Sequence, residues 1–167
     1  MADDTVDRLL AAWRRERPDV DVSPLEVFSR VSRLALLLGR ARADAFGEVG
    51  LEEWGFDVLA ALRRCPPPHR LSPGALLAET MVSSATTTHR LDRLEAAGLV
   101  ARSRDPADGR GVQVALTPAG RVRVDRALEL LAAAEAGLLT PLGARDTERL
   151  AALLRRLLAA LERPGSP

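Results

Sequence analysis

Apolar residues recur at helical spacing along most of this 167-residue chain. A first apolar stripe predicts a helix over residues 5–16, which Pro18 ends. A second stripe follows Ser23-Pro24-Leu25-Glu26, which predicts a capping box with proline at the first helical position, and continues to Phe46. A third helix is expected over residues 51–64, because the proline run that follows cannot continue it.

The C-terminal part of the chain has the same helical pattern. Thr117-Pro118 has the cap residue and proline of a helix start, and predicts a long helix to about Leu139. A last helix is expected from about Ala144 to Glu162, with an apolar stripe made of Leu150, Leu153, Leu154, Leu157, Leu158 and Leu161. No later element is left to cover this stripe, so we expect a second copy of the chain to cover it in a two-fold homodimer. The alternative is that the stripe folds back onto the second helix of the same chain.

Between these helical regions, two short helices are predicted from Leu71 to Gly98. Ser72-Pro73 starts the first, a new start follows at Ser83 or Ser84, and Gly98 can end the second in the left-handed conformation. Two helices joined by so short a turn form a helix-turn-helix, whose second helix can enter the major groove of DNA.

The second of these short helices has a polar outer face. Thr87, Leu91 and Leu94 have the spacing of a buried stripe. The remaining side chains are short hydrogen-bonding groups or cations, and those we expect to contact DNA are Ser84, Thr86, Thr88, His89 and Arg93.

A charged hairpin is predicted after this helix. Residues 99–104 and 112–116 have the pattern of strands, and a turn rich in proline, aspartate and glycine separates them. Arg110 at the tip can insert into a minor groove, so the hairpin resembles the wing of a winged helix-turn-helix. His69-Arg70-Leu71 is expected to add a short strand. The fold class is therefore mainly α with a small antiparallel β wing, flanked by N- and C-terminal dimerisation helices.

The charge distribution supports DNA as the partner more than the net charge does. The net charge is only +1, but residues 83–126 hold eight arginines against five acidic residues, whereas residues 1–22 hold four against six. The acidic start does not predict a signal peptide, and no apolar run approaches the roughly 18 residues of a membrane span. We expect a cytoplasmic protein with no membrane partner.

No enzyme, cofactor or metal site is predicted. The chain has no nucleophile with a nearby base, no glycine loop for phosphate and no carboxylate dyad. His69 and His89 are too few for a metal site. Cys65 is the only cysteine, so the chain cannot form an internal disulfide. A redox role for Cys65 is disfavoured because the C-terminal end of a helix destabilises a thiolate.

Asp57 interrupts an apolar run at the start of the third helix. A buried carboxylate requires a partner, which Arg90 or Arg102 could supply. The alternative is that Asp57 is stabilised only by the N-terminal dipole of its helix.

Residues 105–120, which read DPADGRGVQVALTPAG, resemble the wing signature of the MarR family of bacterial regulators: an aspartate, a wing arginine and then Leu-Thr-x-x-Gly. Residues 90–100, RLDRLEAAGLV, are similar to the recognition helix of that family. The resemblance implies a triangular homodimer that binds a pseudopalindromic, double-stranded operator, usually as a repressor released by a small ligand.

A narrower resemblance links the chain to the PecS subgroup of this family, whose members have an additional N-terminal helix. It is carried by residues 13–21, WRRERPDVD, and 56–64, FDVLAALRR. In urate-responsive members, the resemblance implies ligand-binding roles for the residues that stand here as Trp13, Asp57, Arg90 and Arg102. The chain departs from the subgroup around Ala85 to Thr87 and at His89, so its operator is expected to differ. Some relatives respond to citrate-like carboxylates, which leaves urate and a carboxylate both open as the anionic effector.

These patterns predict three regions. Residues 1–50 are expected to form an N-terminal arm and first long helix that serve dimerisation and a ligand pocket. Residues 51–117 are expected to form the winged helix-turn-helix that binds DNA, and residues 118–167 the C-terminal dimerisation helices. The function expected is a ligand-responsive, DNA-binding transcriptional regulator. The alternative is a winged-helix module that binds another protein and responds to no ligand.

Overall fold

The computed structural model describes residues 3–80, 84–104 and 111–163 of the chain, with the backbone alone described for residues 84–87. The elements within this part are α1 (Thr5–Glu16), α2 (Pro24–Gly47), α3 (Glu53–Arg64), β1 (Arg70–Leu71), α4 (Pro73–Thr80), α5 (Ser84–Ala96), β2 (Val100–Arg104), β3 (Val112–Leu116), α6 (Pro118–Leu139) and α7 (Ala144–Leu161). The predicted fold class is confirmed, because helices dominate and the strands form one small antiparallel sheet.

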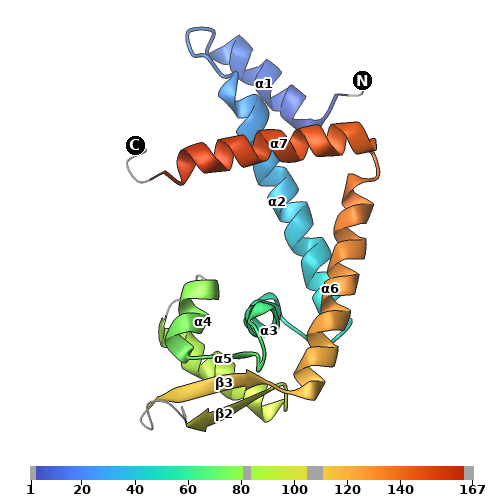
Figure 1. Ribbon diagram of the computed structural model, residues 1–167. Coiled ribbons are helices and arrows are strands. Elements are labelled where there is room, and N and C mark those ends of the chain that lie inside the picture. The colour runs from blue at the N-terminus through green and yellow to red at the C-terminus, as the bar shows by residue number, and fades with distance from the viewer. Residues whose placement is uncertain (1–2, 81–83, 105–110, 164–167) are drawn as a thin grey trace.

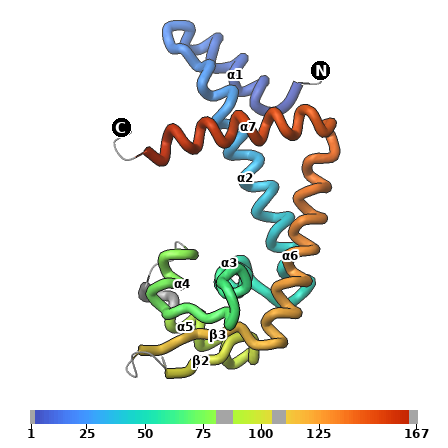
Figure 2. The backbone as a smooth tube through the Cα atoms, in the orientation of Figure 1, coloured from blue at the N-terminus to red at the C-terminus, as the bar shows by residue number. Residues whose placement is uncertain are grey.

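The chain is divided into a winged helix-turn-helix and a set of helices that extends away from it. Figure 1 shows α3, α4, α5 and the strands gathered at one end, with α1 and α7 at the other. The helices α2 and α6 connect the two ends and pack against each other, which the backbone trace in Figure 2 makes clear.

The main core lies in the winged helix-turn-helix, around α3. Leu59 and Leu62 are fully buried on this helix, and Phe46 at the end of α2 stacks on Phe56 with a centroid distance of 4.6 Å. Leu76 of α4 and Val114 of β3 complete the same cluster. A separate small cluster joins α1 to the start of α2 through Val6, Leu10 and Val22.

Most helix boundaries agree with the sequence signals. Thr117 caps α6 as predicted, since its hydroxyl accepts from the amide of Gly120 at 2.9 Å. Gly98 lies just after α5 with a φ of 69°, the left-handed conformation expected of it. The predicted capping box at Ser23 is wrong, although α2 does begin at Pro24. The Ser23 hydroxyl donates to Asp21 at 3.0 Å instead, and it makes no cap hydrogen bond.

The sheet has the strand order β1-β3-β2, with both pairings antiparallel. Residues Arg70 and Leu71 form β1 and pair with Ala115 and Val114 of β3, so the expected short strand is confirmed. The β2–β3 pairing extends from Val100–Leu116 to Arg104–Val112, which is the base of the predicted wing.

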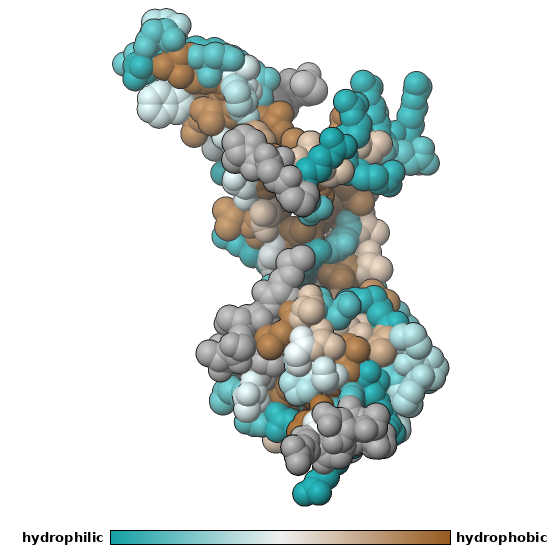
Figure 3. All heavy atoms as spheres, turned by 60° about the vertical axis from the view of Figure 1, so that its left-hand side comes forward, coloured by the Kyte–Doolittle hydropathy of each residue, from teal (hydrophilic) through white to brown (hydrophobic). Residues whose placement is uncertain are grey.

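The last helix does not fold back into the core. No residue of α7 is buried, and the leucines of its apolar stripe are largely exposed, Leu158 at 54% and Leu161 at 59%. The intramolecular alternative is therefore not realised. Apolar residues are also exposed on α1 and α2, and Figure 3 shows them among the polar groups at the upper end of the molecule.

A helix that spans a membrane must be both long enough and apolar enough. No single helix among the described residues has both properties; only α6 and α7 together reach that length and composition, and a bend of 105° separates them.

Gly120 allows α6 to start directly against the backbone before β2. A Cβ at this position would lie 2.0 Å from the carbonyl oxygen of Leu99, a distance that real Cβ atoms do not show. The hydroxyl of Thr117 also donates to that region, 2.8 Å from the Gly98 oxygen and 3.0 Å from the Leu99 oxygen. The glycine of the Leu-Thr-x-x-Gly sequence therefore joins the wing to α6.

Replacing this glycine should destabilise the fold. We expect Gly120→Ala to lower the free energy of unfolding by about 1–3 kcal/mol, because the backbone on both sides must shift to remove the clash. The matched control is Gly137→Ala, also within α6, where a Cβ would meet nothing within 4 Å and the gain in helix propensity should stabilise by about 0.5–1 kcal/mol. Urea unfolding followed by circular dichroism, at one protein concentration, measures both. Equal stability of Gly120→Ala and the parent protein would contradict the close approach.

Candidate nucleic-acid interface

The recognition helix α5 is anchored by two leucines. Leu91 and Leu94 are 2% and 4% exposed and belong to the main core, as their spacing predicted. The preceding helix α4 begins after Ser72, whose hydroxyl accepts from the amide of Ala75 at 3.2 Å. With the core on one side of α5, the opposite side can face a ligand, and Thr88 and His89 are exposed there.

Arg102 of β2 joins the wing to one flank of α5. Its guanidinium lies 2.6 Å from a carboxylate oxygen of Asp92 and 3.3 Å from one of Glu95, and it donates to the Thr88 carbonyl at 3.3 Å. Its backbone amide also donates to Glu95 at 3.0 Å. Three consecutive turns of the helix are therefore attached to one strand residue, and the wing and the recognition helix form one unit.

Arg90 and Arg93 lie on the other flank of α5, over the ring of Trp54. Their guanidinium carbons are 5.4 and 5.0 Å from the ring centroid, within the range of cation–π contacts. Arg93 also pairs with Glu52 at 2.5 Å, and the indole nitrogen of Trp54 donates to the same carboxylate at 2.6 Å. The hydrogen bond from Trp54, followed by that from Arg93, lowers the pKa of Glu52, so this carboxylate is ionised at neutral pH.

Three of the predicted DNA contacts can be placed. Thr88 and His89 are exposed on α5, and Arg93 is about half exposed beside them. The side chains of Ser84 and Thr86, and the whole of Arg110, lie outside the described part of the chain. Their assignments to DNA therefore stay predictions.

Asp57 lies half-buried on α3 and has no ion pair with any described residue. Burial raises the pKa of its carboxyl, the nearby Glu53 adds to this, and Arg42, Arg64 and Arg90 act in the opposite direction. Of the two arginines expected to serve Asp57, Arg90 acts on it only through the electrostatic field. Arg102 is instead paired with Asp92 and Glu95 on the recognition helix.

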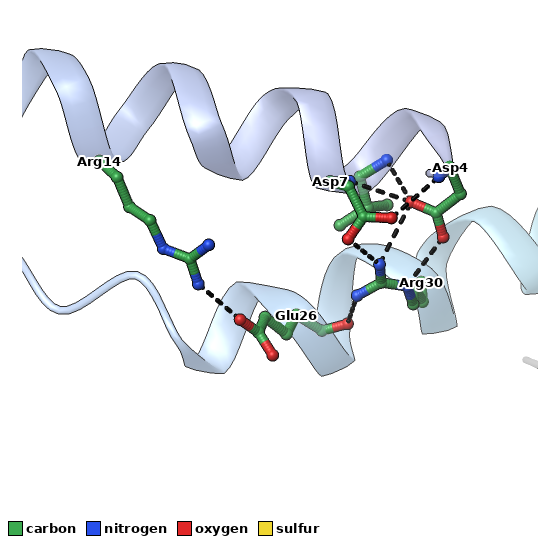
Figure 4. A network of polar contacts seen from close by, with 6 residues as sticks. Asp4, Asp7, Arg14, Glu26 and Arg30 are labelled. Atoms are coloured by element: carbon green, nitrogen blue, oxygen red, sulfur yellow. Dashed lines mark hydrogen bonds and ion pairs between the residues drawn. The ribbon is translucent and has the colours of Figure 1, made fainter. Parts of the chain in front are cut away.

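Trp13 lies in a different part of the chain from the other expected ligand-binding residues. It is 48% exposed on α1, which ion pairs attach to the first turns of α2. Arg14 pairs with Glu26 at 2.5 Å, and Arg30 pairs with Asp4 at 2.8 Å and Asp7 at 2.7 Å, the network drawn in Figure 4. In Figure 1, α1 is at the opposite end of α2 from α3. One chain therefore brings Asp57 and Arg90 near each other but leaves Trp13 apart.

Cys65 and the two histidines form no site among the described residues. No group of three or more histidine, cysteine, aspartate or glutamate side chains is placed there to hold a metal ion. Cys65 donates a weak hydrogen bond to the Arg70 carbonyl at 3.3 Å, and His69 contacts the Cys65 carbonyl at 2.7 Å. These contacts close the turn between α3 and β1.

Sequence reasoning missed Glu52 and Trp54. Neither belongs to an apolar stripe or a known motif, and the contact with Arg93 spans 41 positions of the chain. The one available signal was a tryptophan beside a carboxylate at a helix start, a pairing that is common in many settings. Their role becomes visible only when α3 and α5 are placed side by side.

Comparison with known proteins gives a consistent result. Residues 50–111 match the family model described as the MarR family. The chain is 38% identical to the HTH-type transcriptional regulator PecS of Dickeya dadantii (strain 3937), over 91% of this chain and 92% of that protein.

Solved structures of the same family are similar over most of their length, at lower sequence identity. Bordetella bronchiseptica BpsR, studied for the regulation of its DNA binding by 6-hydroxynicotinic acid, shares 27% identity with a TM-score of 0.66, over 78% of this chain and 91% of that one. A mutant of E. coli MarR in complex with operator DNA shares 25% identity with a TM-score of 0.68, over 83% of this chain and 96% of that one.

Proposed function

The chain belongs to the MarR family of winged-helix transcriptional regulators, and from this premise we propose that it is a homodimeric repressor that binds a pseudopalindromic operator and is released by a small anionic ligand. The relatives are DNA-binding regulators and not enzymes. A regulator of bacterial promoters works where the chromosome is, in the cytoplasm.

The observation that carries the DNA-binding proposal is the outer face of α5. Thr88 and His89 are exposed on it, and Arg93 lies at its edge. Because Arg102 attaches this helix to the strands of the wing, both reading elements can approach DNA as one body, the helix in the major groove and the hairpin in the adjacent minor groove. The related MarR complex with operator DNA supports this use of the fold.

Binding to an operator can be tested with the promoter region beside the gene. We expect specific binding that weakens as salt is raised, and we expect Arg110→Ala to reduce the affinity by about 1–3 kcal/mol, because an arginine in a minor groove contributes shape recognition and phosphate attraction. Fluorescence anisotropy on labelled duplexes at several salt concentrations measures this, with a scrambled duplex as control. Equal affinity for both duplexes would favour the alternative of a protein-binding module, and an unchanged Arg110→Ala would exclude the wing from the interface.

The dimer proposal rests on the exposed leucines of α7. An unpartnered helix with Leu153, Leu154, Leu158 and Leu161 exposed is unusual for a monomer, and a second copy can cover it around a two-fold axis. A two-fold dimer would also place two recognition helices at the spacing that a pseudopalindrome requires.

Charges placed in this stripe should prevent dimerisation. We expect Leu154→Asp together with Leu158→Asp to give monomers or unfolded chains, because unpaired carboxylates cannot be buried without a large penalty. Light scattering and circular dichroism separate these two results. Replacing Arg155 and Arg156 by Glu, on the same helix but outside the stripe, is the control and should leave a dimer. A folded wild-type monomer at micromolar concentration would refute the proposal.

The ligand proposal rests on Asp57 and Arg90. A carboxylate with a raised pKa lies within the field of an arginine on the recognition helix, so an anion bound nearby can alter both groups. Arg102 can contact the ligand only if it gives up its ion pairs with Asp92 and Glu95. Trp13 lies too far from Asp57 within one chain, so it can contact the ligand only from a second copy. The regulation of BpsR by 6-hydroxynicotinic acid, a planar aromatic acid, supports a planar anion such as urate as the first candidate; a tricarboxylate is the second.

Release by a ligand requires a preference for the DNA-free state of only about 1–3 kcal/mol. We expect millimolar urate or citrate to dissociate the operator complex and to change tryptophan fluorescence. Because Trp13 reaches the ligand only from a second copy of the chain, Trp13→Phe should remove the part of the fluorescence change that this copy supplies and leave the part from Trp54, whose ring contacts Arg90. Asp57→Asn should retain operator binding and alter release. If neither compound changes fluorescence or operator occupancy, the ligand proposal is wrong and the DNA-binding proposal stands.

A further inference from the structure

Glu52 and Trp54 hold Arg93, a residue of the recognition helix, through three contacts. One carboxylate oxygen of Glu52 lies 2.5 Å from the Arg93 guanidinium, and the other accepts from the Trp54 indole nitrogen at 2.6 Å. The same guanidinium lies over the Trp54 ring, 5.0 Å from its centroid. Each of the three side chains is therefore oriented by the other two.

The cation in this arrangement, the Arg93 guanidinium, lies on the side of α5 that we propose faces DNA. Arg93 is four positions after the exposed His89, and its side chain is 51% exposed, so the guanidinium is accessible from the outer face of the helix. Its charge is nevertheless balanced by Glu52. The carboxylate is itself 55% exposed and attached to the start of α3, not to the recognition helix.

We propose that Glu52 is a positioning residue that competes with DNA phosphate for Arg93, so that operator binding exchanges one anionic partner of this arginine for another. The proposal rests on the proposed DNA-binding function. Trp54 keeps the guanidinium beside the groove during the exchange, because a ring contact does not occupy the N–H groups that a phosphate would accept from.

Breaking the ion pair between Arg93 and Glu52 costs little free energy, and this cost lowers the affinity for the operator. An exposed ion pair of this kind contributes little to stability, so a phosphate can replace it. Once Arg93 has left, Glu52 is an unpaired negative charge close to the DNA backbone and attracts a cation from solution. Part of the counterion release expected from the new phosphate contact is thereby cancelled.

Removing only the charge of Glu52 tests this. In Glu52→Gln the amide oxygen can still accept from Trp54, but no anion competes for Arg93. We expect the operator affinity at moderate salt to rise roughly two- to fivefold, the range that the loss of an exposed ion pair corresponds to. We also expect the slope of log affinity against log salt to become steeper by up to about 0.9, the value for one additional phosphate contact.

A double-mutant cycle separates competition for Arg93 from a general loss of negative charge. The proteins are wild type, Glu52→Gln, Arg93→Gln and the double variant, measured by anisotropy on the operator duplex from 50 to 200 mM salt. Glu48→Gln is the charge-matched control, because Glu48 is exposed four positions earlier and has no ion pair with a described residue. Its slope should match that of wild type.

The proposal predicts that Glu52→Gln steepens the salt dependence in the parent protein and has no more effect than Glu48→Gln when Arg93 is absent. A parent slope unchanged by Glu52→Gln, or the same increase with and without Arg93, would overturn it while leaving the DNA-binding function intact. Absence of specific operator binding by the wild-type protein would overturn both.

Discussion

Burial of Leu91 and Leu94 is the interaction on which the proposed DNA-reading surface depends. A helix of 13 residues is marginal by itself in water, so α5 must take its stability from the core beneath it. Only one side of the helix is apolar, and the two leucines pack there among residues of α3, α4 and the sheet. This contact fixes the rotation of α5 about its axis. Asp92 and Glu95 then face the wing, Arg90 and Arg93 face Trp54, and His89 is exposed.

A second constraint connects this surface to the long helices. Gly120 and Thr117 join the backbone before β2 to the first turn of α6, and α6 packs along α2. Further along, Arg42 of α2 pairs with Glu135 of α6 at 2.7 Å and approaches Glu53 of α3 at 3.8 Å. The position of the recognition helix is therefore linked mechanically to the helices proposed to form the dimer. A ligand that acts near Asp57 would act where these connections meet.

The sequence predicted the elements well because their signals are local. The first helix was expected at residues 5–16 and lies there, and the short strand at Leu71 and the left-handed Gly98 followed from turn and cap residues close to them. Ser23 was mispredicted for a related reason: a capping box depends on the exact backbone of one residue, and Asp21 offered the hydroxyl a nearer partner.

The site was less predictable because it depends on contacts between distant elements. Arg102 was expected to meet Asp57 or an anion, but the acids of the recognition helix are closer once β2 is paired to β3. Glu52 and Trp54 carried only the weak signal of a tryptophan near a carboxylate at a helix start, and their contact with Arg93 depends on the position of α3 relative to α5. Trp13 was assigned from a family resemblance, and a single chain leaves it on an outer helix, so that assignment depends on the second copy of the chain that we propose.

Hydrogen–deuterium exchange with and without the operator duplex tests the central claim, that α5 and the wing read DNA as one unit. The account predicts that binding protects the amides of α5 and those of β2 together, because Arg102 joins them, with smaller changes in α7. Protection confined to α7 or to the α1–α2 arm, with α5 and β2 unchanged, would show that another surface contacts the DNA and would contradict the account.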